Sequence, residues 1–336
     1  MNVLITGGAG YIGSHTCKEL ARNGYLPVSY DNLVRGHERA VKWGPLEKGD
    51  IADTVRLVQI IKKYEIGAVI HFAAFAYVGE SVSRPDIYYQ NNLSGSLSLL
   101  NAMKETGVRK IVFSSTCATY GDPVELPIRE SHPQNPVNPY GFSKFAVERM
   151  IRDFGSAFGI RSVCLRYFNA AGADVDCEIG ESHYPETHLI PLALAAAFGE
   201  TSALTVYGSD YPTRDGTCIR DYIHVTDLAS AHILALKALQ NDGFVSQAYN
   251  LGSGRGASVR EIIASVEKLT GRKVPCVYGG RRAGDSAVLV AESSRARTEL
   301  GWDPVVSDIE TIIESASRWR EGLQCKGNEG AREIER

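Results

Sequence analysis

The sequence has few cysteines, and none is placed as a metal site or a disulfide framework requires. Its Cys count is 7 in 336 residues, an odd number, and no C-x-x-C pair occurs. Zinc sites and disulfide scaffolds show paired cysteines at short, regular spacings. We therefore expect neither a bound metal nor a disulfide framework.

Long hydrophobic runs are also missing. No uninterrupted apolar run approaches the roughly 18 residues that a membrane span needs. The chain enters an apolar strand at Val3, without a charged leading segment or a small-residue cleavage site. We expect cytoplasmic residence and no membrane contact.

A surplus of positive charge is missing as well. The 36 Lys and Arg residues face 39 Asp and Glu residues, which leaves a net charge of -3. Binding to a nucleic-acid backbone depends on such a surplus, so nucleic acid is not expected as a partner. The hydrophobic share of 44% and the charged share of 22% are those of a soluble globular chain with material for a sizeable core.

Short apolar runs alternate with amphipathic segments through the first half of the chain. The expected strands are 3–5, 27–30, 68–72, 110–113 and 162–166, and the expected helices are 12–23, 53–64, 88–106 and 140–158. This βαβα order predicts an α/β fold, a doubly wound parallel Rossmann sheet with right-handed crossovers.

The regular alternation fades in the second half, where Pro, Tyr and charged loop residues become frequent. We predict a nucleotide-binding domain over 1–170, to which 221–250 returns. A smaller α/β substrate-binding domain would comprise 171–220 and 251–320, and 321–336 would be a flexible tail. Ser258 and Glu261 form a capping box, which predicts the start of a further helix.

A glycine-rich turn joins the first expected strand to the first expected helix. Gly7, Gly10 and Gly13 fit the spacing of a dinucleotide-binding turn, in which the missing side chains let the backbone approach a pyrophosphate. Asp31 follows at about the 20-residue offset of a carboxylate that binds the adenosine ribose. A carboxylate there repels a 2′-phosphate, so NAD is favoured over NADP, although Arg35 lies nearby.

Tyr140 and Lys144 lie four residues apart at the start of an expected helix, on one face of it. A cation about 5 Å from the phenol contributes roughly 3 kcal/mol, or about two pK units of depression. The tyrosinate could then accept a hydroxyl proton while the carbon gives up hydride. The other interpretation is a chance pair on a solvated helix.

Hydroxyl side chains follow the fourth expected strand, at Ser114, Ser115 and Thr116. The carboxyl ends of parallel strands meet at one edge of the sheet, so these hydroxyls are expected to face the same crevice as the glycine turn. By itself, such a run is more often ordinary turn chemistry.

Together, these features resemble the extended short-chain dehydrogenase/reductase family, and within it the enzymes that epimerise UDP-sugars at C4. The resemblance extends from Met1 to about Trp319. Further motifs carry it, among them Gly49-Asp50-Ile51, His71-Phe72-Ala73-Ala74, Tyr88-Tyr89-Gln90-Asn91-Asn92, Leu165-Arg166-Tyr167-Phe168-Asn169 and Arg220-Asp221-Tyr222-Ile223-His224-Val225.

The resemblance implies roles for individual residues. NAD would be bound by Gly7, Gly10, Tyr11, Ile12, Gly13, Asp31, Asn32, Asp50, Ile51, Phe72, Ala73, Ala74, Asn91, Tyr140, Lys144 and Phe168. Tyr140 would be the base, Lys144 would hold the nicotinamide ribose, and Thr116 would bind the reacting sugar oxygen. The UDP-sugar would be bound by Thr116, Asn169, His188, Leu189, Tyr207, Arg220, Arg282 and Asp285.

The implied reaction is the NAD-dependent inversion of the C4 hydroxyl of a UDP-sugar, UDP-glucose to UDP-galactose, through a transient 4-keto intermediate. The family also implies a homodimer built on the helices near 91–105 and 140–158. Four phenylalanines on the second of these helices form either a stripe facing the core, which is the commoner case, or part of a dimer seam: Phe142, Phe145, Phe154 and Phe158.

Other activities remain as alternatives. A nucleotide-sugar dehydratase would carry Thr-Asp-Glu where this chain has Thr116, Cys117 and Ala118, so elimination of water is disfavoured. A dehydrogenase that exchanges its cofactor stays possible in principle. A non-catalytic NAD sensor would have no need of Tyr140 and Lys144.

The identity of the sugar is a separate question. Ala76 stands where many such enzymes have a lysine, and His188 stands where a substrate-contacting asparagine is frequent. These forms resemble the branch that includes UDP-arabinose (UDP-xylose) 4-epimerases. Leu289 replaces a bulky tyrosine that can exclude N-acetylated sugars. We expect UDP-glucose and UDP-galactose first, the pentose pair second, and UDP-N-acetylhexosamines less.

Overall fold

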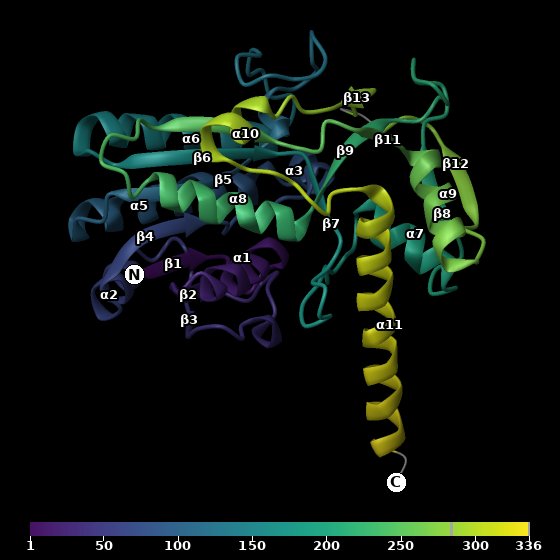
Figure 1. Cartoon of the computed structure of the whole chain (residues 1–336), viewed down its shortest axis with the longest axis horizontal. Coiled ribbons are helices and arrows are strands. Elements are labelled where there is room, and N and C mark those ends of the chain that lie inside the picture. Colours follow the sequence, from purple (N-terminus) through teal and green to yellow (C-terminus); the bar gives the residue numbers. More distant parts are fainter. Residues whose placement is uncertain (283–284, 335–336) are drawn as a thin grey trace.

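The computed structural model describes residues 1–282 and 285–334, with side chains through Leu323. Its centre is a parallel sheet of seven described strands in the order β10-β6-β5-β4-β1-β2-β3 (Figure 1). The strands are β1 (Asn2–Thr6), β2 (Leu26–Asp31), β3 (Leu46–Lys48), β4 (Ile66–His71), β5 (Lys110–Thr116), β6 (Arg161–Tyr167) and β10 (Gln247–Leu251). The sheet is doubly wound, so the predicted fold class is confirmed.

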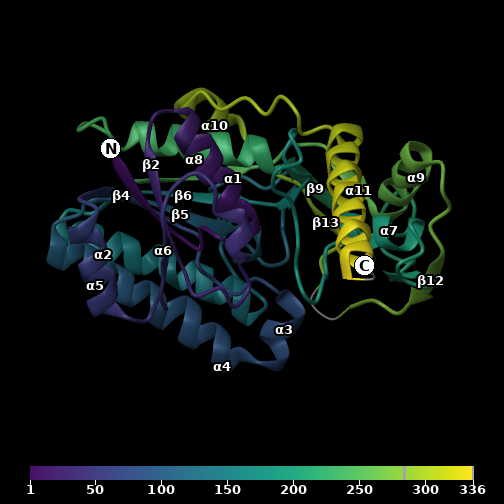
Figure 2. The ribbon, with the colours of Figure 1, turned by 90° about the horizontal axis from the view of Figure 1, so that it is seen from below.

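Helices cover both faces of the sheet, as right-handed crossovers between parallel strands require. Figure 2 shows α1 (Tyr11–Arg22) and α8 (Val225–Ala238) on one side, and α2 (Thr54–Lys63), α5 (Gly95–Thr106) and α6 (Pro139–Phe158) on the other. Their apolar faces shield both sides of the sheet from water, which is why the sequences of its strands are nearly continuous hydrophobic runs.

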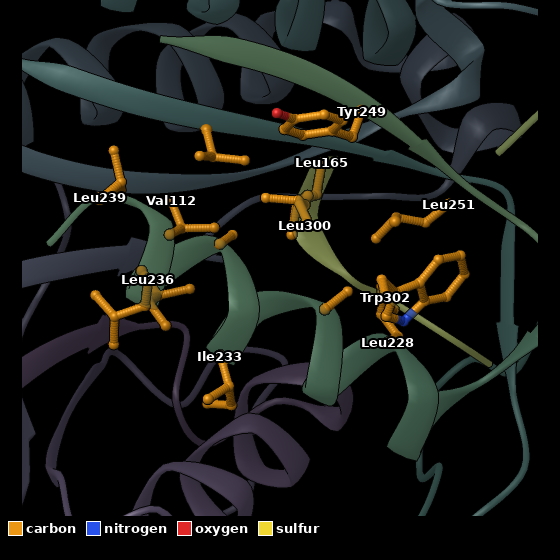
Figure 3. Close-up of a cluster of buried hydrophobic side chains, with 14 of the residues drawn as sticks. Val112, Leu165, Leu228, Ile233, Leu236, Leu239, Tyr249, Leu251, Leu300 and Trp302 are labelled. Atoms are coloured by element: carbon orange, nitrogen blue, oxygen red, sulfur yellow. The ribbon is translucent and has the colours of Figure 1, made fainter. Parts of the chain in front are cut away.

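One hydrophobic core lies between α8 and the sheet. Figure 3 shows Val112 and Leu165 from the sheet facing Leu236 from α8, with Trp302 closing one end. Trp302 is 1% exposed, and its indole Nε1 donates to the main-chain oxygen of Asp227, 2.9 Å away. Burying one such aliphatic side chain contributes about 1.5–3 kcal/mol, so this core holds α8 firmly on the sheet.

A second region is built from smaller sheets. One contains β7 (Asn169–Ala171), β9 (Ile219–His224), β11 (Gly256–Ser258) and β13 (Val288–Leu289), and another pairs β8 (Leu204–Tyr207) with β12 (Cys276–Gly279). The helices α7 (Leu189–Ala197), α9 (Val259–Thr270) and α11 (Ile309–Ile334) pack around them. The predicted capping box of Ser258 and Glu261 is confirmed at the start of α9. The division into domains stays a prediction.

The predicted helix over 88–106 is interrupted. It consists of α4 (Pro85–Tyr88), the π-helical turn η2 (Tyr89–Ser94) and α5. Within η2, the Asn92 side chain accepts a hydrogen bond from the backbone N–H of Phe75 and donates to Ser143 Oγ, which ties the cavity loop after β4 to α6. Single-turn π-bulges of this kind are frequent at functional sites.

The remaining elements are short, and the chain ends in a long helix. They are η1 (Glu38–Ala40), α3 (Val78–Ser83), η3 (Cys117–Thr119) and α10 (Ser294–Leu300). Helix α11 runs away from the rest of the molecule in Figure 1 and continues to Ile334, so 321–334 is helical. The flexibility expected of this tail stays a prediction, and 335–336 lie outside the described residues. Each described helix is too short or too polar for a membrane span.

Candidate active site

A cavity of about 810 Å³ opens at the carboxyl ends of the central strands. Gly7, Asp31, Phe72, Thr116 and Phe168, which end or directly follow β1, β2, β4, β5 and β6, all line it. Ligands of doubly wound sheets bind at this edge, because the connections diverge there and leave a crevice. The second region closes the opposite side of the cavity.

The cavity brings together nearly all of the site residues expected from the sequence. Those that line it are Gly7, Gly10, Tyr11, Ile12, Gly13, Asp31, Asn32, Ile51, Phe72, Ala73, Ala74, Asn91, Thr116, Tyr140, Lys144, Phe168, Asn169, His188, Leu189, Tyr207, Arg220, Arg282 and Asp285. Asp50 does not line it. Its carboxylate instead accepts a hydrogen bond of 3.1 Å from Asn32 Nδ2, so any contact of Asp50 with a ligand stays a prediction.

The glycine turn has no room for side chains. Gly7 has φ +76°, and a Cβ there would lie 2.7 Å from the backbone nitrogen of Ala73. A Cβ on Gly13 would lie 2.2 Å from the carbonyl oxygen of Gly7. Gly10, the N-cap of α1, offers no side chain to the first N–H groups of the helix. These groups remain free to bind an anion that approaches closely.

Asp31 presents a buried carboxylate to the same part of the cavity. Its side chain accepts hydrogen bonds from the backbone N–H groups of Ala9, at 3.0 Å, and Leu33, at 2.8 Å. Burial raises the pKa of Asp31, and these two hydrogen bonds oppose that rise. The backbone thus holds the carboxylate in a fixed position at the end of β2.

Arg35, which left the choice between NAD and NADP open in the sequence, is engaged elsewhere. Its Nη2 lies 2.8 Å from Glu80 Oε1, and its guanidinium stacks on the ring of Tyr77 at 4.9 Å. An arginine already paired with a carboxylate is a poor partner for a 2′-phosphate. The electrostatics around Asp31 therefore favour a ribose with a free 2′-hydroxyl.

Tyr140 and Lys144 lie in the first turns of α6, which positions both toward the cavity. Helix α6 starts at Pro139, and the side chain of the N-cap Asn138 accepts a hydrogen bond of 2.8 Å from the N–H of Gly141. Tyr140 and Lys144 are 8% and 4% exposed. They meet Thr116, the last residue of β5, at the cavity wall. The expected catalytic group is thus assembled from one helix start and one strand end.

The electrostatics of this group differ from the sequence-based expectation. Burial, together with the nearby Tyr167, raises the pKa of Tyr140 above its usual value, and a hydrogen bond with Thr116 only partly opposes the rise. Burial also lowers the pKa of Lys144 to about 7, and its Nζ donates to the Ser114 carbonyl oxygen at 2.7 Å. Without bound cofactor, desolvation thus outweighs any lowering of the tyrosine pKa, and the depression by Lys144 together with an oxidised nicotinamide stays a prediction.

The opposite end of the cavity is formed by polar side chains from separate segments. The guanidinium of Arg282 lies over the ring of Tyr207 at 4.3 Å, and Arg220 Nη2 lies 3.6 Å from Asp285 Oδ1. Asn169, at the start of β7, lies at the same end. Two guanidinium groups and an aromatic face in one recess suit an anionic ligand that carries a flat ring.

Sequence reasoning missed two hydrogen-bonding features of the cavity. Tyr167 and Ser114, from β6 and β5, bond to each other through their hydroxyl groups at 2.5 Å, next to Tyr140. Burial raises the pKa of Tyr167 to about 12. Ser114 was noticed only as part of a hydroxyl run, because pairing between strands distant in the chain is not visible in a single sequence.

The second missed feature is a group of histidines and glutamates at the cavity mouth. Glu181, His183 and Glu186 join His188, the only one of the four that the sequence resemblance named. Burial would lower the pKa of His183, but hydrogen bonds to both glutamates outweigh it and raise the pKa to about 9. Alternating His and Glu over 181–188 was the available signal, but only the fold shows that they converge.

Comparison with known proteins places this chain among close relatives. The sequence profile of the NAD dependent epimerase/dehydratase family matches residues 3–252. A UDP-glucose 4-epimerase of Rhizobium meliloti (strain 1021) is 54% identical over 318 residues, which is 95% of this chain and 96% of that one.

Solved structures agree with these sequence matches. The UDP-glucose 4-epimerase of Brucella ovis in complex with NAD has a TM-score of 0.92 at 56% identity, covering 94% of this chain and 97% of that one. The enzyme of Bifidobacterium longum in complex with NAD+ and UDP has a TM-score of 0.92 at 40% identity, covering 96% and 98% of the two chains. The chain therefore belongs to the NAD dependent epimerase/dehydratase family.

Proposed function

We propose that this protein inverts the C4 hydroxyl of UDP-glucose, giving UDP-galactose, with NAD as its bound cofactor. The observation that carries the proposal is the order of groups along one cavity. A glycine turn and a buried acid form one end, Tyr140, Lys144 and Thr116 lie in the middle, and two arginines with an aromatic ring form the other end. The chemistry thus lies between two nucleotide-binding ends.

The described residues fit NAD. The backbone turn at Gly7, Gly10 and Gly13 is suited to a pyrophosphate, because added side chains would collide with the protein itself. Asp31 would accept a hydrogen bond from the adenosine ribose, and Lys144 would hold the nicotinamide ribose. Bound NAD supplies the acceptor for the C4 hydride, which returns to the same carbon, and a positive charge on its ring.

Tyr140 would accept the proton of the sugar 4-hydroxyl and return it after the 4-keto sugar has turned over. Thr116 would bind the same sugar oxygen and hold it toward Tyr140. In the protein alone, burial keeps the phenol protonated at neutral pH, because its pKa is raised. The base form therefore needs added positive charge nearby, from a protonated Lys144 and from the cofactor ring.

The nucleotide end would anchor the substrate while the hexose turns. Arg220, Arg282 and Asn169 would bind the diphosphate, because a guanidinium matches paired phosphate oxygens. Tyr207 would lie against the uracil, and Asp285 would bind the uridine ribose. His188, Leu189 and Thr116 would contact the sugar, which must stay loosely held because both of its faces have to meet the cofactor.

Other sugars and reactions are less well supported. Cys117 and Ala118 line the cavity after Thr116, so no carboxylate stands there to eliminate water. The similar proteins described above act on UDP-glucose, which favours the hexose over UDP-xylose or an N-acetylhexosamine.

We further propose that the protein works as a homodimer in the cytoplasm. On η2, α5 and α6, four apolar side chains keep much of their surface exposed: Tyr89 37%, Leu97 41%, Phe142 45% and Phe158 38%. An exposed apolar face of this kind is typical of an interface. Six cysteines of the described chain are free thiols, which agrees with a reducing compartment. Sedimentation at micromolar concentration tests the dimer, and a purely monomeric species would contradict it.

The direct test is turnover by the purified protein. Incubation with UDP-glucose should yield UDP-galactose without net formation of NADH, and the near-UV spectrum should show bound nucleotide. UDP-glucose, UDP-xylose and UDP-N-acetylglucosamine at equal concentration should show the highest kcat/KM for UDP-glucose. Accumulation of free NADH would instead identify a dehydrogenase, and no turnover of any UDP-sugar would favour a non-catalytic NAD protein.

A further inference from the structure

A second group of reactive side chains lies at the mouth of the cavity, apart from Tyr140 and Lys144. Glu181, His183, Glu186 and His188 each offer one ligand atom, and these atoms lie within 4.8 Å of one another. All four come from the loop between β7 and α7, and His188 is the N-cap of α7. The loop thus folds back so that its own side chains converge.

The distances between these ligand atoms are close to the distances between the ligand atoms of a bound zinc ion. Glu181 Oε1 lies 2.8 Å from His188 Nδ1 and 3.1 Å from His183 Nδ1. Glu186 contributes Oε1, 3.0 Å from His188 Nδ1, and Oε2, 3.7 Å from His183 Nδ1. Ligands held tetrahedrally at zinc bond lengths of about 2.0–2.1 Å are about 3.3 Å apart. Small side-chain shifts are therefore enough to reach that geometry.

The surroundings hold these ligands in place. The Glu181 side chain is only 7% exposed, and the Glu181 carbonyl oxygen accepts a hydrogen bond of 3.0 Å from Trp319 Nε1. The rings of Tyr11 and Tyr77 stand edge-on against His183, with centroids 6.1 and 6.0 Å away. The packing of these rings restricts the orientation of the His183 imidazole.

A second acidic group in the same loop is already paired with a cation from the protein itself. Asp174, Asp176 and Glu178 surround the ammonium of Lys18, whose Nζ lies 2.7, 2.9 and 2.6 Å from them. That cluster already holds its cation. In the described part of the chain, the ion pairs of Glu181 and Glu186 are with the two histidines alone, whose protons a metal ion would displace on binding.

We propose that Glu181, His183, Glu186 and His188 bind one divalent transition-metal ion, with Zn²⁺ as the preferred metal. Two imidazoles and two carboxylates form a tetrahedral N₂O₂ set, and the two carboxylates balance the charge of the ion. Four protein ligands fill the coordination of zinc, so the site is structural. His188 would bind the ion through Nδ1, the atom that faces the two glutamates, which leaves its Nε2 for the proposed sugar contact. The ion would hold the 181–188 loop, which lines the cavity next to Tyr11, in one conformation. This proposal does not depend on which reaction takes place in the cavity.

The test measures metal binding by the full-length protein, independently of epimerisation. Protein stripped with a chelator and then dialysed against micromolar Zn²⁺ should retain about one zinc ion per chain, as measured by elemental mass spectrometry. Added Zn²⁺ should also raise the Tm of the stripped protein, and Co²⁺ in its place should give the visible absorption of a tetrahedral N/O site. The proposal would be overturned if the wild type retained no more zinc than the double variant His183→Gln/Glu181→Gln.

Variants distinguish this site from surface binding. His183→Gln should weaken zinc binding by at least about tenfold, and the double variant His183→Gln/Glu181→Gln should abolish it. Asp176→Asn, in the cluster that already holds Lys18, should bind zinc as the wild type does. Circular dichroism confirms that each variant is folded, and the Tm shift of the wild type gives a measurement that needs no variant. Equal zinc affinity in the wild type and the double variant, or loss of zinc only in Asp176→Asn, would refute the assignment.

Discussion

The two ends of the cavity are built in different ways. The cofactor end, taken together with the adjoining middle of the cavity, contains Gly7, Gly13, Asp31, Tyr140 and Lys144. These residues come from βα units of the large sheet, and the two expected catalytic side chains are at most 8% exposed. The nucleotide end consists of polar side chains from separate segments of the second region, and one of them, a tyrosine, is 42% exposed. The cofactor end is buried, whereas the nucleotide end is built from partly exposed side chains.

This difference predicts how each end responds to substitution. At the cofactor end, backbone and side chains are confined, so changes should alter the chemical step or the free energy of unfolding. At the nucleotide end, a lost side chain leaves little strain behind and should weaken substrate binding. Three measurements test this contrast, and a fourth compares two glutamates outside the cavity, in order of decreasing expected effect.

Replacing Tyr140 with Phe removes the proposed base at the cofactor end. We expect kcat to fall by about 10²–10⁴-fold, because no group remains to accept the 4-hydroxyl proton. The KM and the content of bound NAD should change little. Steady-state kinetics and nucleotide released by acid measure these quantities. Tyr278→Phe, which makes the same change at a tyrosine that is 53% exposed, is the control, and near-full activity of Tyr140→Phe would remove Tyr140 from the chemical step.

Replacing Arg220 with Met tests the nucleotide end. A hydrogen bond to a charged phosphate is worth about 1.5–3 kcal/mol, so KM for UDP-glucose should rise roughly 10- to 100-fold while kcat changes little. Arg297→Met, at a surface pair with Asp303, should leave both constants unchanged. A fall in kcat at unchanged KM would break the contrast between the two ends.

Replacing Gly13 with Ala strains the glycine turn. The added Cβ would meet the Gly7 carbonyl oxygen at 2.2 Å, so the backbone must move. We expect a loss of about 1–3 kcal/mol in the free energy of unfolding and a lower NAD content. In contrast, Gly322→Ala on α11 meets nothing within 4 Å and should not destabilise the protein. Chemical denaturation of both variants provides the comparison, and equal stabilities would show that the turn adapts.

The smallest expected effect is the loss of unfolding free energy when a glutamate with a lowered pKa is replaced, and the chain offers two such glutamates. The hydrogen bond from Lys63 lowers the pKa of the buried Glu47, and Lys273 does the same for Glu267 in the second region. A carboxyl group whose pKa is lower in the folded protein stabilises it at pH values above the pKa of that group in the unfolded chain. This contribution is lost as the pH falls through the pKa of the folded state. Glu47→Gln should cost at most about 1 kcal/mol at pH 7 and nothing at low pH.

Glu267→Gln serves as the comparison for Glu47→Gln. It should show a smaller pH-dependent loss, because the Glu267 side chain is 26% exposed and the Glu47 side chain only 9%. Urea denaturation at several pH values measures both. A loss that persists unchanged at low pH in Glu47→Gln would show that the residue acts through packing and not through its charge.

Much of the cofactor end could be predicted from local patterns. The spacing of Gly7, Gly10 and Gly13, the position of Asp31 and the Tyr140/Lys144 pair are all short-range features, and the structure brings them to one cavity. Five of the seven described strands of the central sheet, β1, β2, β4, β5 and β6, were predicted by their apolar runs, whereas β3 and β10 were not. The nucleotide end was predicted by family resemblance alone, because its groups are far apart in the chain and share no local pattern.

The sequence by itself determined most strands and helices of the large sheet, the glycine turn and the residue types that line the cavity, because these depend on patterns within a few residues. Tertiary structure alone decided that burial raises the pKa of Tyr140 and lowers that of Lys144, that Arg35 is paired with Glu80, and that Glu181, His183, Glu186 and His188 meet. Desolvation and the convergence of side chains depend on what packs around each group, and that packing exists only in the folded chain.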